Sequence, residues 1–202
     1  MVRPPVPPVY FFVIDVTAAQ GGSFKRKRKK IFLIIIIIII IYMFDFNLFC
    51  CRLFPNYSSQ GSQMLNSCVN AIRSSLDSLP GNPRTQIGFI TFDSSIHFYN
   101  LKSSLTSPQM LVVSDVSDVI MPLPDDLLVN LQDSRKVIDE LLNSIPTMFA
   151  KNSSIHNCMG PALMAAKRII QNVGGKICLF QTTLPNLGEG ALKQRENVRL
   201  IG

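Results

Sequence analysis

A short polar run near the start of the chain carries the side chains best suited to binding a cation. The run is Asp15-Val16-Thr17-Ala18-Ala19, and it contributes one carboxylate and one hydroxyl. A hard cation such as Mg²⁺ or Ca²⁺ needs several oxygen ligands, and Ala19 offers none from its side chain. Asp93 and the pair Asp125-Asp126 could in principle add carboxylates. The missing ligand favours the alternative, in which Asp15 ends a strand and accepts hydrogen bonds from backbone groups.

Signals for catalysis are weaker than this signal for a cation. His97 lies in an alternating segment and His156 in a polar one, and neither has a nucleophile or carboxylate pattern near it. The chain contains no GxGxxG motif, and the isolated Gly188-Glu189-Gly190 is better explained as a turn. The sequence therefore predicts no catalytic residue and no enzyme.

Strands and helices alternate along the chain and would position the polar run. Val9 to Ile14 is a continuous apolar run, typical of a strand covered on both faces. Because prolines cannot donate ladder hydrogen bonds, this strand should begin after Pro8. The alternation favours an α/β doubly wound sheet with a hairpin-like stretch, residues 86–101, on one edge. Further strands are expected at 110–113 and 176–181, and helices at about 62–79, 134–145 and 161–173.

One basic run accounts for nearly all of the net charge. The 202-residue chain has a formal charge of +7. The run from Lys25 to Lys30 supplies six positive charges, which leaves 7 − 6 = +1 for the remaining residues. A broad nucleic-acid-binding surface is therefore not supported. The five cysteines form an odd number without CxxC spacing, which favours a reducing, cytosolic setting.

Residues 21–61 differ in character from the rest of the chain. The basic run is followed by an uninterrupted apolar run of 14 residues, Ile31 to Phe44, with eight consecutive isoleucines. Because a membrane-spanning helix needs about 20 residues, a membrane anchor through residues 31–54 is the weaker interpretation. The stronger one is a low-complexity insertion outside the fold. We therefore expect one domain formed by residues 1–20 and 62–202.

Four stretches outside the insertion resemble a known family: RPPVPPVYFFVIDVT, IRSSLDSLPGNPRTQIGFITFDSSIHFYNLKSSLTSPQMLVVSD, PLPDDLLVNL and GGKICLFQTTLPNLGEGALKQR. They are similar to the trunk domain of the COPII inner-coat cargo adaptor of the Sec-twenty-four type. The resemblance implies a von Willebrand factor A-like fold, present here as an incomplete fragment with an insertion at the first strand-to-helix junction. A-domains bind metal through Asp-x-Ser-x-Ser. Asp15 and Thr17 match that motif and Ala19 departs from it, so we expect a degenerate site without metal.

The resemblance also implies a function and partners. The expected function is that of a vesicle coat component in protein transport from the endoplasmic reticulum to the Golgi. The expected partners are the second inner-coat subunit, cargo or SNARE proteins, and the endoplasmic reticulum membrane surface through the coat, without nucleic acid. The expected location is the cytoplasm and the coat at the cytosolic face of that membrane. No cofactor is expected, because the family's zinc module lies before the trunk.

An exposed strand edge is the surface through which such a domain can bind partners. The candidate edges are Ile96 to Leu101 and Met110 to Val113. The predicted partner-binding residues are Ile96, Phe98, Tyr99, Leu101 and Met110, with ordinary core packing as the alternative for these side chains. Two other functions stay open at this point: a metal-dependent A-domain ligand binder that uses Asp15, and a membrane-anchored protein.

Overall fold

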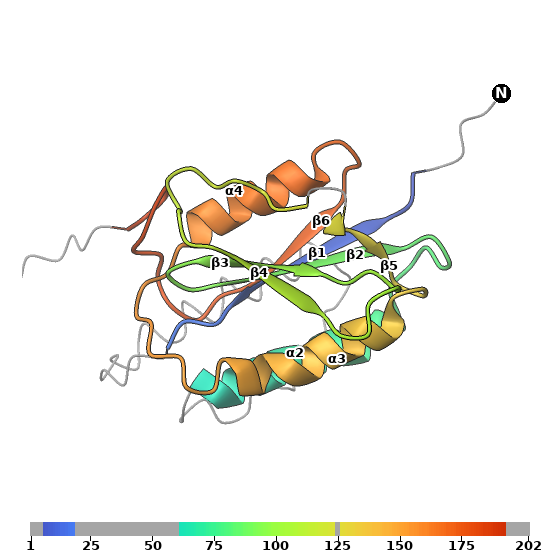
Figure 1. The fold of residues 1–202 in the computed structure, drawn as a ribbon, viewed down its shortest axis with the longest axis horizontal. Helices are drawn as coiled ribbons and strands as arrows, with labels where there is room; N and C mark the ends of the chain where they lie inside the picture. Colours follow the sequence, from blue (N-terminus) through green and yellow to red (C-terminus); the bar gives the residue numbers. More distant parts are fainter. Residues whose placement is uncertain (1–5, 19–60, 124–125, 193–202) are drawn as a thin grey trace, which may run out of the picture.

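The computed structural model describes residues 6–18, 61–123 and 126–192. The described part forms a three-layer α/β arrangement around one mixed sheet (Figure 1). The strand order is β4-β3-β2-β1-β6, and β5 pairs separately with β2. The strands are β1 (Val9–Asp15), β2 (Gln86–Phe92), β3 (Ile96–Asn100), β4 (Gln109–Val113), β5 (Val129–Asn130) and β6 (Lys176–Phe180). The expected α/β fold class is confirmed.

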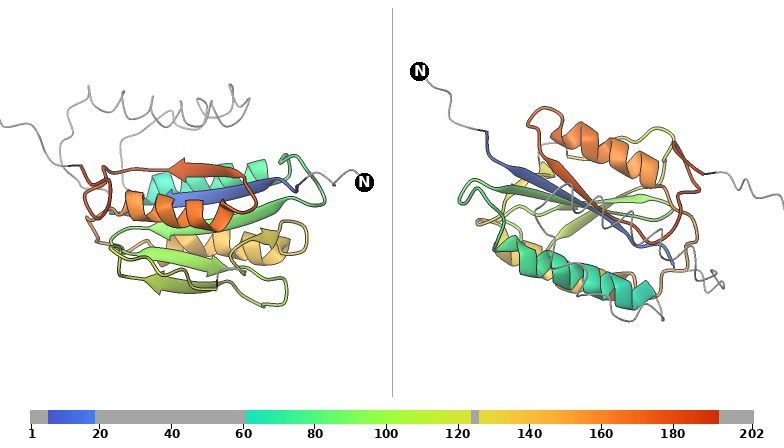
Figure 2. Two further views of the ribbon diagram at one scale, coloured as in Figure 1. Left: turned by 90° about the horizontal axis from the view of Figure 1, so that it is seen from above. Right: turned by 180° about the vertical axis from the view of Figure 1, so that it is seen from behind.

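Helices cover both faces of the sheet. Helices α2 (Gly61–Leu76) and α3 (Arg135–Met148) lie side by side on one face, and α4 (Met159–Ile170) lies on the other (Figure 2). Each helix turns an apolar stripe toward the strands because its apolar residues recur every three or four positions. On α3 these buried residues are Val137, Ile138, Leu141, Leu142 and Ile145.

Strand β1 is central, and every one of its residues is buried. Tyr10, Phe12 and Ile14 pack into the core under α2 and α3. Val9, Phe11 and Val13 pack into the core under α4, because successive side chains of a strand point to opposite faces. Strand β1 pairs in parallel with both β2 and β6. The prediction of a doubly covered strand that begins after Pro8 is confirmed.

One of the two candidate edge strands is confirmed and the other was wrong. Strand β3, which contains most of the candidate edge Ile96 to Leu101, is antiparallel to β2 on one side and to β4 on the other. Strand β4, which contains the candidate edge Met110 to Val113, forms this edge in the described part of the chain. Sequence periodicity missed β5, whose two residues pair with Gln86 and Ile87 at the start of β2.

No helix within the described ranges is long and apolar enough to cross a membrane. The proposed membrane anchor, residues 31–54, lies outside the described residues. The same holds for the insertion up to residue 60, and its exclusion from the domain stays a prediction.

Candidate functional site

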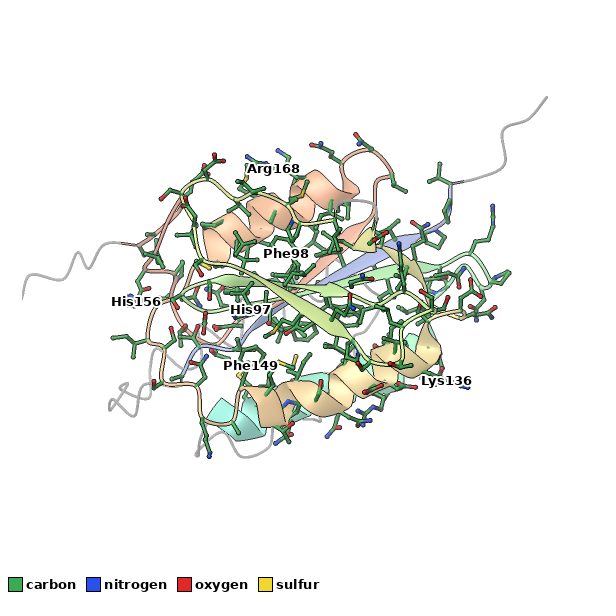
Figure 3. All side chains as sticks on the ribbon, in the orientation of Figure 1. His97, Phe98, Lys136, Phe149, His156 and Arg168 are labelled. Carbon is green, nitrogen blue, oxygen red and sulfur yellow. The ribbon has the colours of Figure 1, made fainter. Side chains whose placement is uncertain are left out.

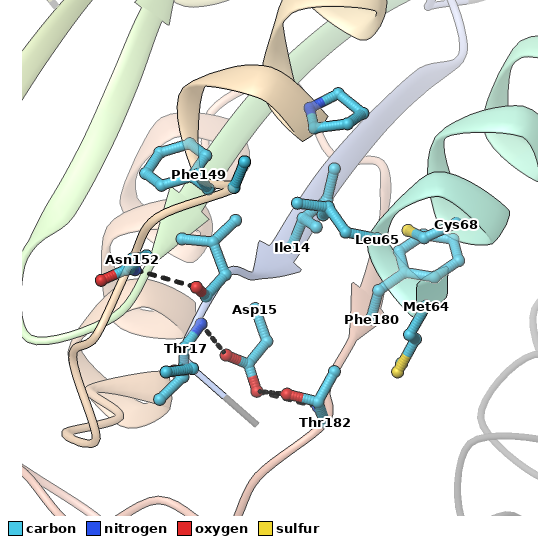
Figure 4. Close-up of a pocket in the computed structure, with 14 residues that line it drawn as sticks. Ile14, Asp15, Thr17, Met64, Leu65, Cys68, Phe149, Asn152, Phe180 and Thr182 are labelled. Carbon is cyan, nitrogen blue, oxygen red and sulfur yellow. Dashed lines mark hydrogen bonds between the residues drawn. The ribbon is translucent and has the colours of Figure 1, made fainter. Parts of the chain in front are cut away.

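Asp15 lies at the carboxyl end of β1, where ligands bind in many open α/β sheets. Its side chain is buried, with the residue only 4% exposed. The carboxylate accepts hydrogen bonds from the backbone N–H groups of Thr17 (2.8 Å), Thr182 (2.8 Å) and Thr183 (3.0 Å). The hydroxyls of Thr182 (2.8 Å) and Thr183 (3.3 Å) and the Asn157 amide (3.0 Å) also donate to it. Figure 4 shows the bonds from Thr17 and Thr182.

These donors occupy the place that a cation would need. Each N–H or O–H group directs a positive hydrogen at the carboxylate, and six such bonds leave it well satisfied. The Thr17 hydroxyl, the second oxygen of the motif, accepts a bond from Asn157 (3.4 Å). Ala19 lies outside the described residues. The arrangement supports the interpretation of Asp15 as a strand-end hydrogen-bond acceptor.

Neither Asp93 nor Asp126 joins Asp15 in a cation site. Asp93, at the end of β2, accepts bonds from the Ser95 N–H (2.9 Å) and the Asn152 amide (2.9 Å). Asp126 forms an ion pair with Lys102 (2.6 Å), at the opposite end of the sheet. Asp125 is outside the described ranges. Within those ranges, no three His, Cys, Asp or Glu side chains are grouped to hold a metal.

Two asparagines that the sequence analysis missed join the strand ends. The Asn152 amide donates to the Val16 carbonyl (2.9 Å) as well as to Asp93, and so bridges β1 and β2. Asn157 is fully buried and links Asp15 to Thr183 (2.9 Å). Both lie in the loop between α3 and α4, far from Asp15 in sequence. Only the folded chain reveals their role.

His97 belongs to a buried polar network on β2 and β3. Its Nδ1 lies 3.0 Å from the Thr91 hydroxyl, which also contacts the Tyr99 hydroxyl at 2.8 Å. Its Nε2 lies 3.3 Å from Ser95 Oγ and 3.9 Å from Asp93. Burial lowers the pKa of His97, although the nearby Asp93 carboxylate opposes that shift. Burial raises the pKa of Tyr99, because in both residues it disfavours the charged form. The polar groups of this network are paired with one another, as in an ordinary protein core.

The predicted partner-binding residues do not share one surface. Ile96 and Phe98 are fully buried under α4, and Tyr99 and Leu101 are buried under α2 and α3. Figure 3 shows Phe98 and His97 in the interior, with Phe149 close to the His97 ring; the two ring centroids lie 5.3 Å apart. These four side chains therefore follow the core-packing alternative.

Met110, the fifth predicted residue, lies on the exposed edge strand β4. It is 39% exposed, and Val112, two positions along the same face, is 52% exposed. The strand, Gln109–Val113, contains no charged residue. In the described part of the chain β4 pairs only with β3. The edge therefore presents both apolar side chains and a backbone that can accept another strand.

Comparisons with known proteins agree with this fold. Residues 56–202 match the model of the Sec23/Sec24 trunk domain. The chain is 46% identical over 203 residues to "Protein transport protein SEC24 A" of Arabidopsis thaliana, and 42% identical over 196 residues to human "Protein transport protein Sec24A". These alignments cover 100% and 97% of this chain but only 16% and 14% of the relatives.

A solved structure supports the same assignment. The crystal structure of the human COPII-coat protein Sec24c matches with a TM-score of 0.70 and 31% sequence identity, over 97% of this chain and 22% of that one. The chain thus spans less than a quarter of the length of these relatives. The sequence match and the shared architecture show that this chain belongs to the Sec23/Sec24 trunk domain family.

Proposed function

We propose that this chain is the trunk part of a COPII vesicle coat component that acts in protein transport from the endoplasmic reticulum to the Golgi. The observation that carries the proposal is the match to the trunk family over residues 56–202, in a chain whose relatives are named protein transport proteins. The role is non-enzymatic. The support for this is the family itself, because the relatives that the chain matches are named as transport proteins and not as enzymes.

The partner of this domain is the second subunit of the inner coat, and the surface that binds it is the β4 edge. Met110 and Val112 give this edge an apolar face, and the unpaired side of β4 offers backbone groups to an added strand. Exposed, uncharged edge strands are usually covered or blunted in proteins, which favours a partner here. The further partners are cargo or SNARE proteins and, through the coat, the cytosolic face of the endoplasmic reticulum membrane. Nucleic acid is not a proposed partner.

Binding of the purified partner subunit to the immobilised chain tests this proposal. Met110→Lys places a charge on the apolar edge, and we expect it to weaken binding at least tenfold because that charge would lose water at the interface. Met164→Lys is the matched control. Met164 is exposed to a similar degree, 37%, but lies on α4, away from β4. Equal loss in both variants, or in neither, would exclude the β4 edge.

The role of the insertion is tested in the same assay. The chain is compared with a variant that lacks Gly22 to Ser59. Binding by the shortened form alone would indicate a trunk domain impaired by its insertion. If neither form binds, residues 1–202 do not suffice for partner binding, and the proposed interface is rejected for this chain.

A further inference from the structure

The turn between β3 and β4 contains an accessible serine that is followed by proline. Ser107-Pro108 is the only Ser-Pro or Thr-Pro pair among the 202 residues of the chain. Ser107 is exposed, and none of the described residues forms a hydrogen bond with it. Strand β4, the partner-binding edge proposed above, begins two residues later at Gln109. The pair therefore lies on the surface, directly beside that edge.

The backbone of this turn suits binding in the cleft of a modifying enzyme. Because the proline ring clashes with a helical residue before it, Ser107 favours an extended backbone, the form in which a peptide segment can enter a cleft. Ser74 and Ser75 differ, since they lie on α2 and donate their hydroxyls to backbone carbonyls. The Ser107 hydroxyl makes no such bond, so its modification removes no contact that holds the fold.

The chemistry available to this serine is phosphoryl transfer. A kinase whose cleft offers no hydrogen-bond acceptor after the serine selects proline there, because proline has no backbone N–H. The Ser107 Oγ would attack the γ-phosphorus of ATP, and the bond from that phosphorus to the bridging oxygen of ADP would break. ADP leaves, and the hydroxyl proton passes to the catalytic base of the kinase.

A phosphate on Ser107 would lie within the area that a partner on β4 covers. Three residues of extended chain place Ser107 about 10 Å from Met110. A standard interface covers about 800 Å² on each protein and so extends about 16 Å from its centre. The phosphate adds a charge of about −2, which would lose water when the partner binds. Lys102, the cation of the same turn, is already paired with Asp126.

We propose that Ser107 is the target of a proline-directed protein kinase, and that its phosphate weakens binding of the partner subunit to the β4 edge. The effect on binding rests on the proposed function. The modification itself does not, because it depends only on the exposed turn and on the Ser-Pro pair.

Phosphate incorporation into the folded full chain tests the site. The chain is incubated with a purified proline-directed kinase and Mg²⁺-ATP, and the phosphate is located by mass spectrometry. We expect it on Ser107, at a rate within about tenfold of that of a free peptide of residues 102–113, because the turn lies on the surface. Ser107→Ala should abolish incorporation. Ser103→Ala, at an exposed serine of the same turn without a following proline, should keep it. No incorporation, incorporation only at other residues, or incorporation only in the free peptide overturns the proposal.

Binding of the phosphorylated chain to the immobilised partner subunit tests the effect. We expect the affinity to fall about tenfold or more, because the dianion loses water at the interface, and to recover after phosphatase treatment. Kinase-treated Ser107→Ala should bind as its own untreated form does, which would place the effect on Ser107. Undiminished binding of the phosphorylated chain overturns the proposal. If the unmodified chain does not bind the partner, the proposed function fails, and incorporation alone decides whether Ser107 is a modification site.

Discussion

Replacement of Asp15 by alanine should remove a large part of the stability of this domain. The change leaves the backbone N–H groups of Thr17, Thr182 and Thr183 without their acceptor and removes one acceptor of the Asn157 amide. Thr17 and Asn157 are buried, and an unsatisfied buried donor costs about 1–3 kcal/mol. Thr182 and Thr183 are half-buried, so water replaces part of their loss. The total is about 4 kcal/mol, against a usual domain stability of about 5–15 kcal/mol.

Urea unfolding followed by far-ultraviolet circular dichroism measures this loss. The control is Asp115→Ala, because Asp115 is exposed and, among the described residues, accepts bonds from the Ser117 and Asp118 N–H groups of its own turn; it should lose less than about 1 kcal/mol. A metal-binding Asp15 would behave differently, since its removal from the metal-free chain would cost little. A neutral Asp15→Ala, or a rise in unfolding temperature on adding Mg²⁺ or Ca²⁺ that Asp15→Ala abolishes, would refute the hydrogen-bond interpretation.

Three further predictions concern the rest of the molecule. Because burial lowers the pKa of His97 below that of the unfolded chain, the unfolded state takes up more protons as the pH falls. The stability present above about pH 6.5 should therefore decline toward pH 5.5, and less steeply in His97→Gln; parallel pH profiles would contradict this. Gly88→Ala would place a Cβ 2.4 Å from the Phe11 ring and 2.7 Å from the Leu127 carbonyl oxygen, so urea unfolding should show a loss of about 2 kcal/mol, and a neutral effect would argue against this packing. Deletion of Gly22 to Ser59 removes an apolar run of high β-propensity and should raise the soluble fraction after expression; equal solubility of both forms would reject that expectation.

Most strands and helices were predictable because the spacing of their apolar residues along the chain places those residues on the face that is buried. The boundary after Pro8 follows from the missing proline N–H, and the end of α4 is followed by Gly174, whose φ of +78° suits a glycine. Strand β5 was missed because a strand of two residues is too short to show an alternation of apolar and polar side chains. The edge at Met110 to Val113 was predicted correctly, but β3 was wrongly included as a second candidate. Its polar residues alternate as if exposed, whereas His97 and Tyr99 are buried and bonded to Thr91.

The candidate site was only half predictable. Asp15 could be identified from the sequence, because it is an acidic residue that directly follows an apolar run and therefore lies at the end of a strand. Its donors could not be found in the same way, because Asn157, Thr182 and Thr183 are more than 140 residues away along the chain. A pattern of two oxygens and a missing third favours a hydrogen-bonded carboxylate over a cation site, but it does not identify the donors. Only the number of donors around the carboxylate separates the two.

Those donors also explain how the carboxyl edge keeps its shape. Asp15 joins the end of β1 to the residues after β6 and to the loop before α4, which is the position where a bound cation would hold these segments together. Because protein N–H and O–H groups already bond this carboxylate, we expect the geometry of the edge to be independent of the cation concentration. Thr182 donates to Asp15 and also lines a pocket of about 270 Å³ beside it, so the same bonds fix one wall of that pocket. Such an edge would suit the protein contacts proposed for this domain, whereas a cation-gated ligand binder would need this carboxylate free.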